Sequence, residues 1–274
     1  MSRPHALVTG GSSGIGLAVA RRLVADMDVS IVARGEQRLE EARDTLQRES
    51  GGRARVITIS ADVSVRDEAQ SAVARAASAL GAPRLVVTSA GVAVPGYFDD
   101  VPVDVFERTM AVNYLGTVYI AKAAVPLMRG SGGRIVMISS GAGLIGLFGY
   151  TPYSPTKFAL RGFAEALHAE LRHEGIGVSI AFPPDTETPQ LIEEEKTKPA
   201  ETRMMTARAG VWSADAVAQR ILHGASRGAF AITPGFEVTA LYRLGSVIAP
   251  LVQWNWARQV ARMRRGGELA THKK

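Results

Sequence analysis

Residues 5–16, HALVTGGSSGIG, join a short apolar run to a glycine-rich turn, and an amphipathic segment, Ile15–Met27, follows at once. Glycines allow the backbone to turn tightly and to lie close to a bound group, while the free N–H groups at a helix start favour an anion. A turn of this kind between a strand and a helix is typical of sites that cradle a pyrophosphate. The stretch therefore predicts a strand, a phosphate-binding turn and a helix.

The same alternation of strand and helix continues along the chain. Short apolar runs without polar alternation lie between segments of helical periodicity, as expected for parallel strands covered on both faces. We therefore predict an α/β fold, a doubly wound (Rossmann-type) parallel sheet of about seven strands, in one domain over residues 1–235. The runs are ALVTG (6–10), VSIVA (29–33), RVITIS (55–60), RLVVTSAG (84–91), RIVMISS (134–140), GVSIAF (177–182) and FAIT (230–233). The helical segments are Ile15–Met27, Gln37–Arg48, Asp67–Leu80, Val103–Met128, Tyr153–His173 and Ala214–Ser226.

Composition excludes several classes of protein. The 274 residues are 46% apolar and 21% charged, which is enough to build a core and excludes a disordered or fibrous chain. Because there is no cysteine, disulfides, thiolate zinc sites and cysteine nucleophiles are excluded, and the five scattered histidines suggest no metal site. We expect no secretory signal segment and no membrane span, since no apolar stretch approaches about 20 residues.

The net charge of +6 comes entirely from the C-terminal segment. Residues 243–274 contain seven basic residues against Glu268 alone, so residues 1–242 are neutral. The basic residues are Arg243, Arg258, Arg262, Arg264, Arg265, Lys273 and Lys274. A neutral domain argues against nucleic acid as a partner, because nucleic-acid binding needs a basic face.

The residue after the second apolar run indicates which dinucleotide is bound. An acidic residue at this place holds a ribose 2′-hydroxyl, whereas arginine accommodates a 2′-phosphate. Here the run ends in Ala33-Arg34, and Arg38 follows four residues later. Guanidinium groups match phosphate geometry, so the sequence predicts NADP(H) as the cofactor. For Arg38 the alternative is a solvated helix residue.

A tyrosine and a lysine mark a candidate catalytic centre. Tyr153 and Lys157 are four residues apart on one helix face, and Pro155 requires the helix to begin close to Tyr153. A free tyrosine has a pKa of about 10, which a nearby ammonium group lowers. Ser140 ends the fifth run, where its hydroxyl would hold a substrate oxygen. The Tyr-x-x-x-Lys spacing alone is common on surfaces; together with the turn and the serine it indicates catalysis.

These motifs resemble the short-chain dehydrogenase/reductase family in order and spacing, over residues 5 to about 235. They are TGGSSGIG (9–16), Asp62, SAG (89–91), Asn113 in NYLGT, Ser140 and YSPTK (153–157). The resemblance implies a Ser140–Tyr153–Lys157 site in which Asn113 completes a proton relay through water. It also implies that Lys157 binds the nicotinamide ribose and that Asp62 lies beside the adenine. The cofactor-binding residues expected are Gly10, Ser12, Ser13, Gly14, Ile15, Arg34, Arg38, Asp62, Val63, Ala90, Gly91, Tyr153, Lys157, Pro183 and Thr186.

Longer strings resemble one group within that family, the 3-ketodihydrosphingosine reductases. They are PPDTETP (183–189), EEKTKP (194–199), FERTMAVNYLGTVY (106–119), GLFGYTPYS (146–154) and KFALRGFAEAL (157–167). The resemblance implies NADPH-dependent reduction of a long-chain sphingoid ketone, with residues 184–210 as the substrate loop. PPDTETP is alternatively only a rigid turn that opens a helix. We expect Glu193–Lys198 (EEEKTK) to form a solvated face rather than part of a site.

Two alternative functions stay open. One is the reduction of another apolar carbonyl, such as a steroid, a retinoid or a 3-ketoacyl thioester. The other is a catalytically idle, membrane-associated NADP-binding partner protein, which the complete Ser–Tyr–Lys set disfavours.

The C-terminal segment, residues 236–274, is predicted as an amphipathic extension with a basic tail. Phe236–Val260 is rich in apolar residues, is broken at Pro250, and is followed by arginines. This pattern is typical of a helix in the headgroup region of an anionic membrane, here through 236–265. The alternatives are packing on the domain itself or on a sister subunit. We expect a cytoplasmic protein, peripheral on the cytoplasmic membrane face, and the resemblance implies a homodimer or homotetramer through Val103–Met128 and Tyr153–His173.

Overall fold

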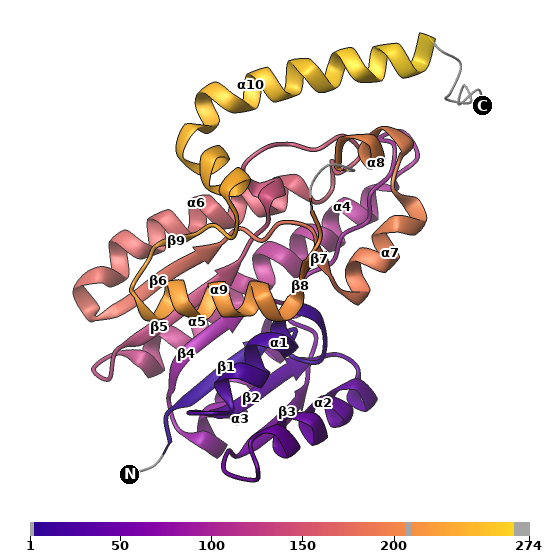
Figure 1. Ribbon diagram of the computed structural model, residues 1–274. Coiled ribbons are helices and arrows are strands. Elements are labelled where there is room, and N and C mark those ends of the chain that lie inside the picture. The colour runs from indigo at the N-terminus through magenta and orange to yellow at the C-terminus, as the bar shows by residue number, and fades with distance from the viewer. Residues whose placement is uncertain (1–2, 207–209, 266–274) are drawn as a thin grey trace.

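The computed structural model describes residues 3–206 and 210–265 and contains one seven-stranded parallel sheet (Figure 1). The strand order is β3-β2-β1-β4-β5-β6-β9, which reverses direction between β1 and β4 and confirms the doubly wound prediction. The strands are β1 (His5–Thr9), β2 (Asp28–Ala33), β3 (Val56–Ser60), β4 (Pro83–Thr88), β5 (Gly133–Ile138), β6 (Ile176–Ala181) and β9 (Ala231–Ile232).

Helices cover both faces of the sheet. One face is covered by α1 (Gly14–Leu23), α2 (Glu36–Glu49) and α9 (Ala214–Ser226). The other is covered by α3 (Arg66–Leu80), α5 (Gly116–Met128) and α6 (Ser154–Leu171), which the short 3₁₀ turn η3 (Arg172–Glu174) ends. Adjacent strand residues face different layers: Leu7 packs with α3 and α5, while Ala6 and Val8 pack with α1. Because both faces of the sheet are buried, its strands appear in the sequence as continuously apolar runs.

The parallel register brings the carboxyl ends of the strands to one edge. Thr9 of β1 is level with Val32 of β2 and with Thr88 of β4, and Ile138 of β5 is level with Ala181 of β6. The turns that follow these strands therefore lie side by side. Ligands bind at this edge in open α/β sheets, at the point where the strand order reverses.

The predicted helix Val103–Met128 is interrupted. It consists of α4 (Val103–Met110), a π-helical turn η1 (Ala111–Leu115) and α5. Single π turns inside α-helices are frequent at functional sites, and this one contains Asn113. Residue periodicity gave no sign of the wider turn.

The predicted substrate loop contains regular elements. These are β7 (Thr186–Glu187), α7 (Pro189–Thr197) and α8 (Ala200–Thr206), and β7 pairs in parallel with β8 (Trp212–Ser213). The Thr188 hydroxyl accepts a hydrogen bond from the N–H of Leu191, and Pro189 stands in the first helical turn of α7. PPDTETP (183–189) is therefore a rigid turn that opens a capped helix, as one of the two interpretations of this string predicted.

The C-terminal extension forms α10 (Phe236–Arg265), whose break lies at Leu244 and not at the predicted Pro250. Leu244 has non-helical angles (φ −120°, ψ 21°) and is followed by Gly245, a weak helix former. Before the break, Leu241 and Tyr242 pack on the core; after it, α10 runs away from the sheet (Figure 1). Within the described residues, no helix is long and apolar enough to span a bilayer. The predicted tail lysines, Lys273 and Lys274, lie outside the described residues.

Candidate active site

A cavity of about 1120 Å³ runs along the carboxyl edge of the sheet, from Arg34 and Arg38 at one end to Tyr153 at the other. The sixteen predicted residues that line it are Gly10, Ser12, Ser13, Gly14, Ile15, Arg34, Arg38, Asp62, Val63, Ala90, Gly91, Ser140, Tyr153, Lys157, Pro183 and Thr186. Of the predicted site residues, all of them in described parts of the chain, Asn113 alone lies behind the cavity wall.

The glycine-rich turn forms the floor of the cavity at the start of α1. Gly10 (φ +66°) and Gly14 (φ +53°) have left-handed backbone conformations that favour glycine. A Cβ at Gly10 would lie 2.8 Å from the Ala90 nitrogen, and one at Gly16 would lie 2.3 Å from the Gly10 carbonyl oxygen. Side chains are thus excluded where the backbone N–H groups and the helix start meet the cavity, which fits a pyrophosphate.

Two arginines line the opposite end of the cavity. Arg34 follows β2 and precedes α2, while Arg38 lies in the first turns of α2. Asp62 stands across from them: its Oδ2 is 3.8 Å from Arg34 Nη1, and its Oδ1 accepts hydrogen bonds from the Ser64 N–H and hydroxyl. The Arg34 side chain is 64% exposed, so its guanidinium is available for a phosphate group.

The two serines after β5 have different roles. Ser140 lines the cavity and its Oγ accepts a hydrogen bond from the Ala142 N–H at 3.1 Å, capping the 3₁₀ turn η2 (Gly141–Gly143). This bond uses an acceptor site and leaves the hydroxyl proton for another oxygen. Ser139, by contrast, donates its hydroxyl to the Lys157 carbonyl at 3.0 Å and joins β5 to α6. The geometry therefore favours Ser140 as the substrate-facing hydroxyl.

Tyr153 stands at the start of α6, as Pro155 predicted, and is buried. Burial raises the pKa of Tyr153 well above its ordinary value, and the nearby carboxylate of Glu194 raises this pKa further. Hydrogen bonding to Ser140 and Gln190 lowers the pKa of Tyr153 but does not cancel the rise. The tyrosine is thus held in its protonated form, ready to donate.

Lys157 lies one turn further along α6, with its Nζ 5.3 Å from the centroid of the Tyr153 ring. The ammonium donates to the Ile138 carbonyl at 3.0 Å. Burial lowers the pKa of Lys157 to about 8, against an opposing effect of Glu194. The pKa of Tyr153 is raised by burial, and the expected lowering of this pKa by Lys157 stays a prediction.

Asn113 holds the wall of the cavity together. Its Nδ2 donates to the Val92 carbonyl and to Thr156 Oγ1, both at 3.0 Å, and its Oδ1 accepts from the Val92 N–H at 2.8 Å. The side chain thereby fixes the segment after β4 to the start of α6. Because both amide protons are engaged, the predicted relay through water gains no direct support from this side chain and stays a prediction.

The expectation that Glu193–Lys198 is a solvated face is wrong for two residues. Glu194 is 8% exposed and Lys198 is 6% exposed. Glu194 accepts hydrogen bonds from the Tyr150 hydroxyl at 2.6 Å and from Gln190 Nε2 at 2.8 Å. All three side chains line the cavity beside Tyr153. Helical spacing could have predicted this burial. Because α7 begins at Pro189, Gln190, Leu191 and Glu194 lie on the same face of the helix.

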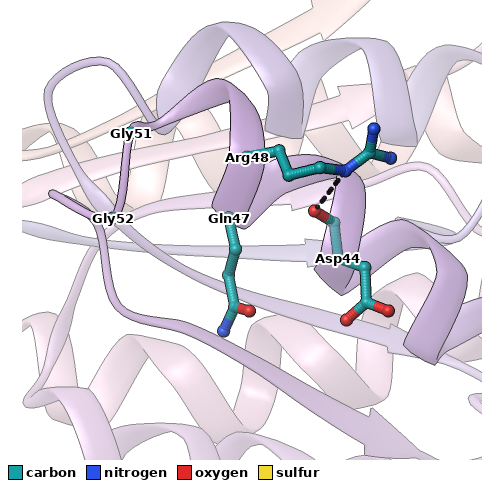
Figure 2. A pocket seen from close by; sticks show the side chains of 5 residues that line it. All are labelled: Asp44, Gln47, Arg48, Gly51 and Gly52. Carbon is teal, nitrogen blue, oxygen red and sulfur yellow. Dashed lines mark hydrogen bonds between the residues drawn. The ribbon is translucent and has the colours of Figure 1, made fainter.

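A second hollow lies at the end of α2 and shares no lining residue with the main cavity. Figure 2 shows its lining: Asp44, Gln47, Arg48, Gly51 and Gly52. The Arg48 guanidinium donates to the Asp44 carbonyl at 3.2 Å, and the polar side chains are solvated. No buried polar group points to a ligand at this hollow, so the main cavity is the candidate site.

Comparisons with known proteins agree with this geometry. A model of the short chain dehydrogenase family matches residues 4–199. The 3-ketodihydrosphingosine reductase of Bos taurus is 39% identical over 251 residues, which are 90% of this chain and 76% of that protein. The 3-dehydrosphinganine reductase of Danio rerio is 40% identical over 251 residues with the same coverage. The 3-ketodihydrosphingosine reductase of Dictyostelium discoideum is 34% identical, over 90% of this chain and 78% of that protein.

Solved structures show the same fold. A short chain dehydrogenase/reductase from Burkholderia phymatum, in complex with NAD, superposes with a TM-score of 0.78 at 25% identity, covering 89% of this chain and 92% of that one. A short-chain dehydrogenase/reductase from Mycobacterium ulcerans superposes with a TM-score of 0.76 at 28% identity, covering 85% and 88%. With its sheet, glycine turn and Ser140–Tyr153–Lys157 centre, the chain belongs to the short-chain dehydrogenase/reductase family of nicotinamide-dependent oxidoreductases.

Proposed function

We propose that this enzyme reduces a long-chain 3-keto sphingoid base, 3-ketodihydrosphingosine, to the corresponding alcohol with NADPH. The observation that carries the proposal is the Ser140–Tyr153 pair at one end of a cavity whose other end holds Arg34 and Arg38. The names of the relatives from Bos taurus and Danio rerio support the substrate class. Pocket walls formed by Val92, Leu147 and Leu191 supply apolar surface next to the polar centre.

The side chains divide the work of the reaction. A nicotinamide cofactor, when bound, supplies the hydride. Ser140 holds the ketone oxygen, and the Tyr153 hydroxyl gives its proton to that oxygen as the alcohol forms. Lys157 stays protonated at neutral pH and would hold the nicotinamide ribose hydroxyls. Arg34, with Arg38, would hold the 2′-phosphate, and the glycine-rich turn would hold the pyrophosphate.

We further propose that α10 docks the enzyme on an anionic lipid surface, at the cytoplasmic face of a membrane. After the break in α10, Val247, Leu251 and Trp254 follow helical spacing; each of them, like Leu244 at the break, is more than half exposed. Arginines follow, and the Arg258 guanidinium lies 4.5 Å from the centroid of the Trp254 ring. Arg264 Nη2 is 3.7 Å from Glu201 Oε1 on α8, a helix that also lines the cavity. A docked α10 would thus bring a lipid substrate close to the site.

NADPH oxidation at 340 nm, with 3-ketodihydrosphingosine in mixed micelles, tests the function. We expect turnover with NADPH that exceeds turnover with NADH and with a steroid ketone. Tyr153→Phe should lower kcat by at least about 100-fold while NADPH binding, followed by its fluorescence, stays unchanged. Turnover of the steroid ketone alone would be consistent with a ketone reductase but would refute the sphingoid base as its substrate. A loss of NADPH binding as large as the loss of rate would refute the role of Tyr153.

A further inference from the structure

A carboxylate that no step of the reduction uses lies beside the proton donor. Glu194 reaches the cavity from α7, and its two oxygens each accept one hydrogen bond, from Gln190 Nε2 and from the Tyr150 hydroxyl. A carboxylate has about four acceptor positions, so roughly two stay free in a side chain that lines the cavity. The Tyr150 ring links Glu194 to the centre, since its centroid is 5.8 Å from that of the Tyr153 ring.

In the part of the chain that the structure describes, this carboxylate forms no ion pair, and Lys157 and Lys198 influence it only at longer range. Both hydrogen-bond donors to Glu194 are neutral, and among the described residues no Lys, Arg or His forms an ion pair with it. The buried Lys198 is instead paired with Glu195. Keeping a buried carboxylate without a paired cation is unfavourable, so the site is suited to a ligand that brings a positive charge.

A second cavity carboxylate, Asp185, is a weaker candidate. The charge of Lys198 is the main influence that stabilises ionised Asp185 against burial. For Glu194, the hydrogen bonds from the neutral Tyr150 and Gln190 side chains stabilise the ionised form more than the charge of Lys198 does. Lys198 thus influences both carboxylates, but only Glu194 is held in the cavity by hydrogen bonds from the side chains beside Tyr153, which makes it the stronger candidate.

We propose that Glu194 binds the ammonium group of the substrate and selects ketones that carry an amine on the carbon next to the carbonyl. This inference rests on the proposed function, in which Ser140 and Tyr153 hold the carbonyl oxygen. An amine one carbon from that carbonyl necessarily lies close to the same two residues, where Glu194 and Tyr150 line the cavity. Glu194 is thus a specificity-determining residue, and Tyr150 and Gln190 are positioning residues that orient its carboxylate.

The test compares 3-ketodihydrosphingosine with its 2-deamino analogue of the same chain length, in mixed micelles with NADPH. The wild type should favour the amine-bearing ketone in kcat/KM. Glu194→Gln keeps the shape and removes the charge; its amide oxygen can still accept from Gln190, and its NH2 group can donate to the Tyr150 hydroxyl, which both donates and accepts. The substitution should reduce the preference about 10- to 100-fold, the value of a charge-assisted hydrogen bond, by slowing the amine-bearing ketone alone. Glu187→Gln removes an exposed carboxylate of the same segment that does not line the cavity, so it should leave the preference unchanged.

Each other outcome has a definite meaning. Equal slowing of both ketones by Glu194→Gln would overturn the inference, because Glu194 would then act through Tyr153 and not on the amine. If the wild type shows no preference between the two ketones, the inference about Glu194 is wrong while ketone reduction stands. The same holds if Asp185→Asn loses the preference and Glu194→Gln keeps it. Turnover of neither ketone would refute the proposed function itself. Should Glu194→Gln fail to bind NADPH, Tyr150→Phe replaces it, since loss of the 2.6 Å bond should also weaken the preference.

Discussion

Burial acts in opposite directions on the two titratable residues of the proposed catalytic centre, Tyr153 and Lys157. It raises the pKa of the Tyr153 hydroxyl and lowers the pKa of the Lys157 ammonium to about 8, because each group is driven towards its neutral form. For ketone reduction the first effect is useful, since a protonated Tyr153 is the form that donates. The second effect would set a limit, since in the proposed mechanism Lys157 must be charged to hold the ribose hydroxyls and to stabilise a phenolate.

The pH dependence of the reaction follows from Lys157. Below its pKa the lysine is protonated, and above about pH 8 it loses the proton, so kcat/KM for NADPH should fall by up to tenfold per pH unit above that value. Tyr153 keeps its proton throughout this range because its pKa lies higher. Initial rates between pH 6 and 10 give the profile. A plateau that extends to pH 10 would show that the lysine in the free enzyme is not shifted downwards.

The proposed preference for NADPH depends on a single residue, Arg34. Arg34→Ala should raise the KM for NADPH about 10- to 100-fold, since it removes a charge-assisted contact to the 2′-phosphate, and should leave the KM for NADH nearly unchanged. Arg43→Ala is the matched control, because Arg43 lies on α2 in an ion pair with Glu40 and does not line the cavity. Steady-state kinetics with both cofactors checks this. Equal effects of Arg34→Ala on NADPH and NADH would exclude a role in 2′-phosphate binding.

The sequence indicated site residues wherever their position follows from one element. Ser140 at a strand end, and Tyr153 with Lys157 on one helical turn, are of this kind. Glu194 was missed because its burial depends on where α7 packs, about 40 residues beyond Tyr150 along the chain. Three consecutive glutamates predict solvent-exposed side chains, because charged residues are rarely buried. Glu194 is buried only because of the tertiary packing of α7.

At the scale of elements, apolar runs predicted all seven strands of the sheet, because buried parallel strands leave the clearest pattern. The two-residue strands β7 and β8 and the π-helical turn were not predicted. Their geometry depends on contacts with other segments: β7 exists only as the partner of β8, and Asn113 in the π turn is held by Val92 and Thr156. The break in α10 lies at Leu244, beside Gly245, and not at Pro250, which the helix accommodates.

The exposed stripe of α10 makes a prediction at this scale. The protein should sediment with vesicles containing anionic lipid at low salt, and less at high salt, because exposed arginines follow the apolar residues. Leu251→Glu should weaken this binding about 10- to 100-fold, the value of burying one leucine side chain. Gln253→Glu adds the same charge to an exposed polar position of the helix and should weaken it far less. Equal binding by the wild type and Leu251→Glu would refute lipid docking through this stripe.

For the whole molecule, the predicted homodimer or homotetramer requires apolar surface on the helices that would face a sister subunit. Phe158 provides it: this residue of α6 is 42% exposed beside the buried Lys157. Light scattering coupled to size exclusion should therefore give the mass of two or four chains. Phe158→Glu should shift the mass towards one chain, since a charge in the middle of a packed interface is unfavourable, while NADPH binding persists.

A matched variant separates this interface from general effects of surface charge. Phe236→Glu makes the same chemical change at another exposed phenylalanine, 86% exposed and located at the start of α10, outside the predicted interface. It should leave the mass of the assembly unchanged. If Phe236→Glu dissociates the assembly and Phe158→Glu does not, the subunits associate through α10. If the wild type is a monomer at micromolar concentration, the exposed face of α6 is solvated, and α10 is then the larger unpartnered apolar surface available for association.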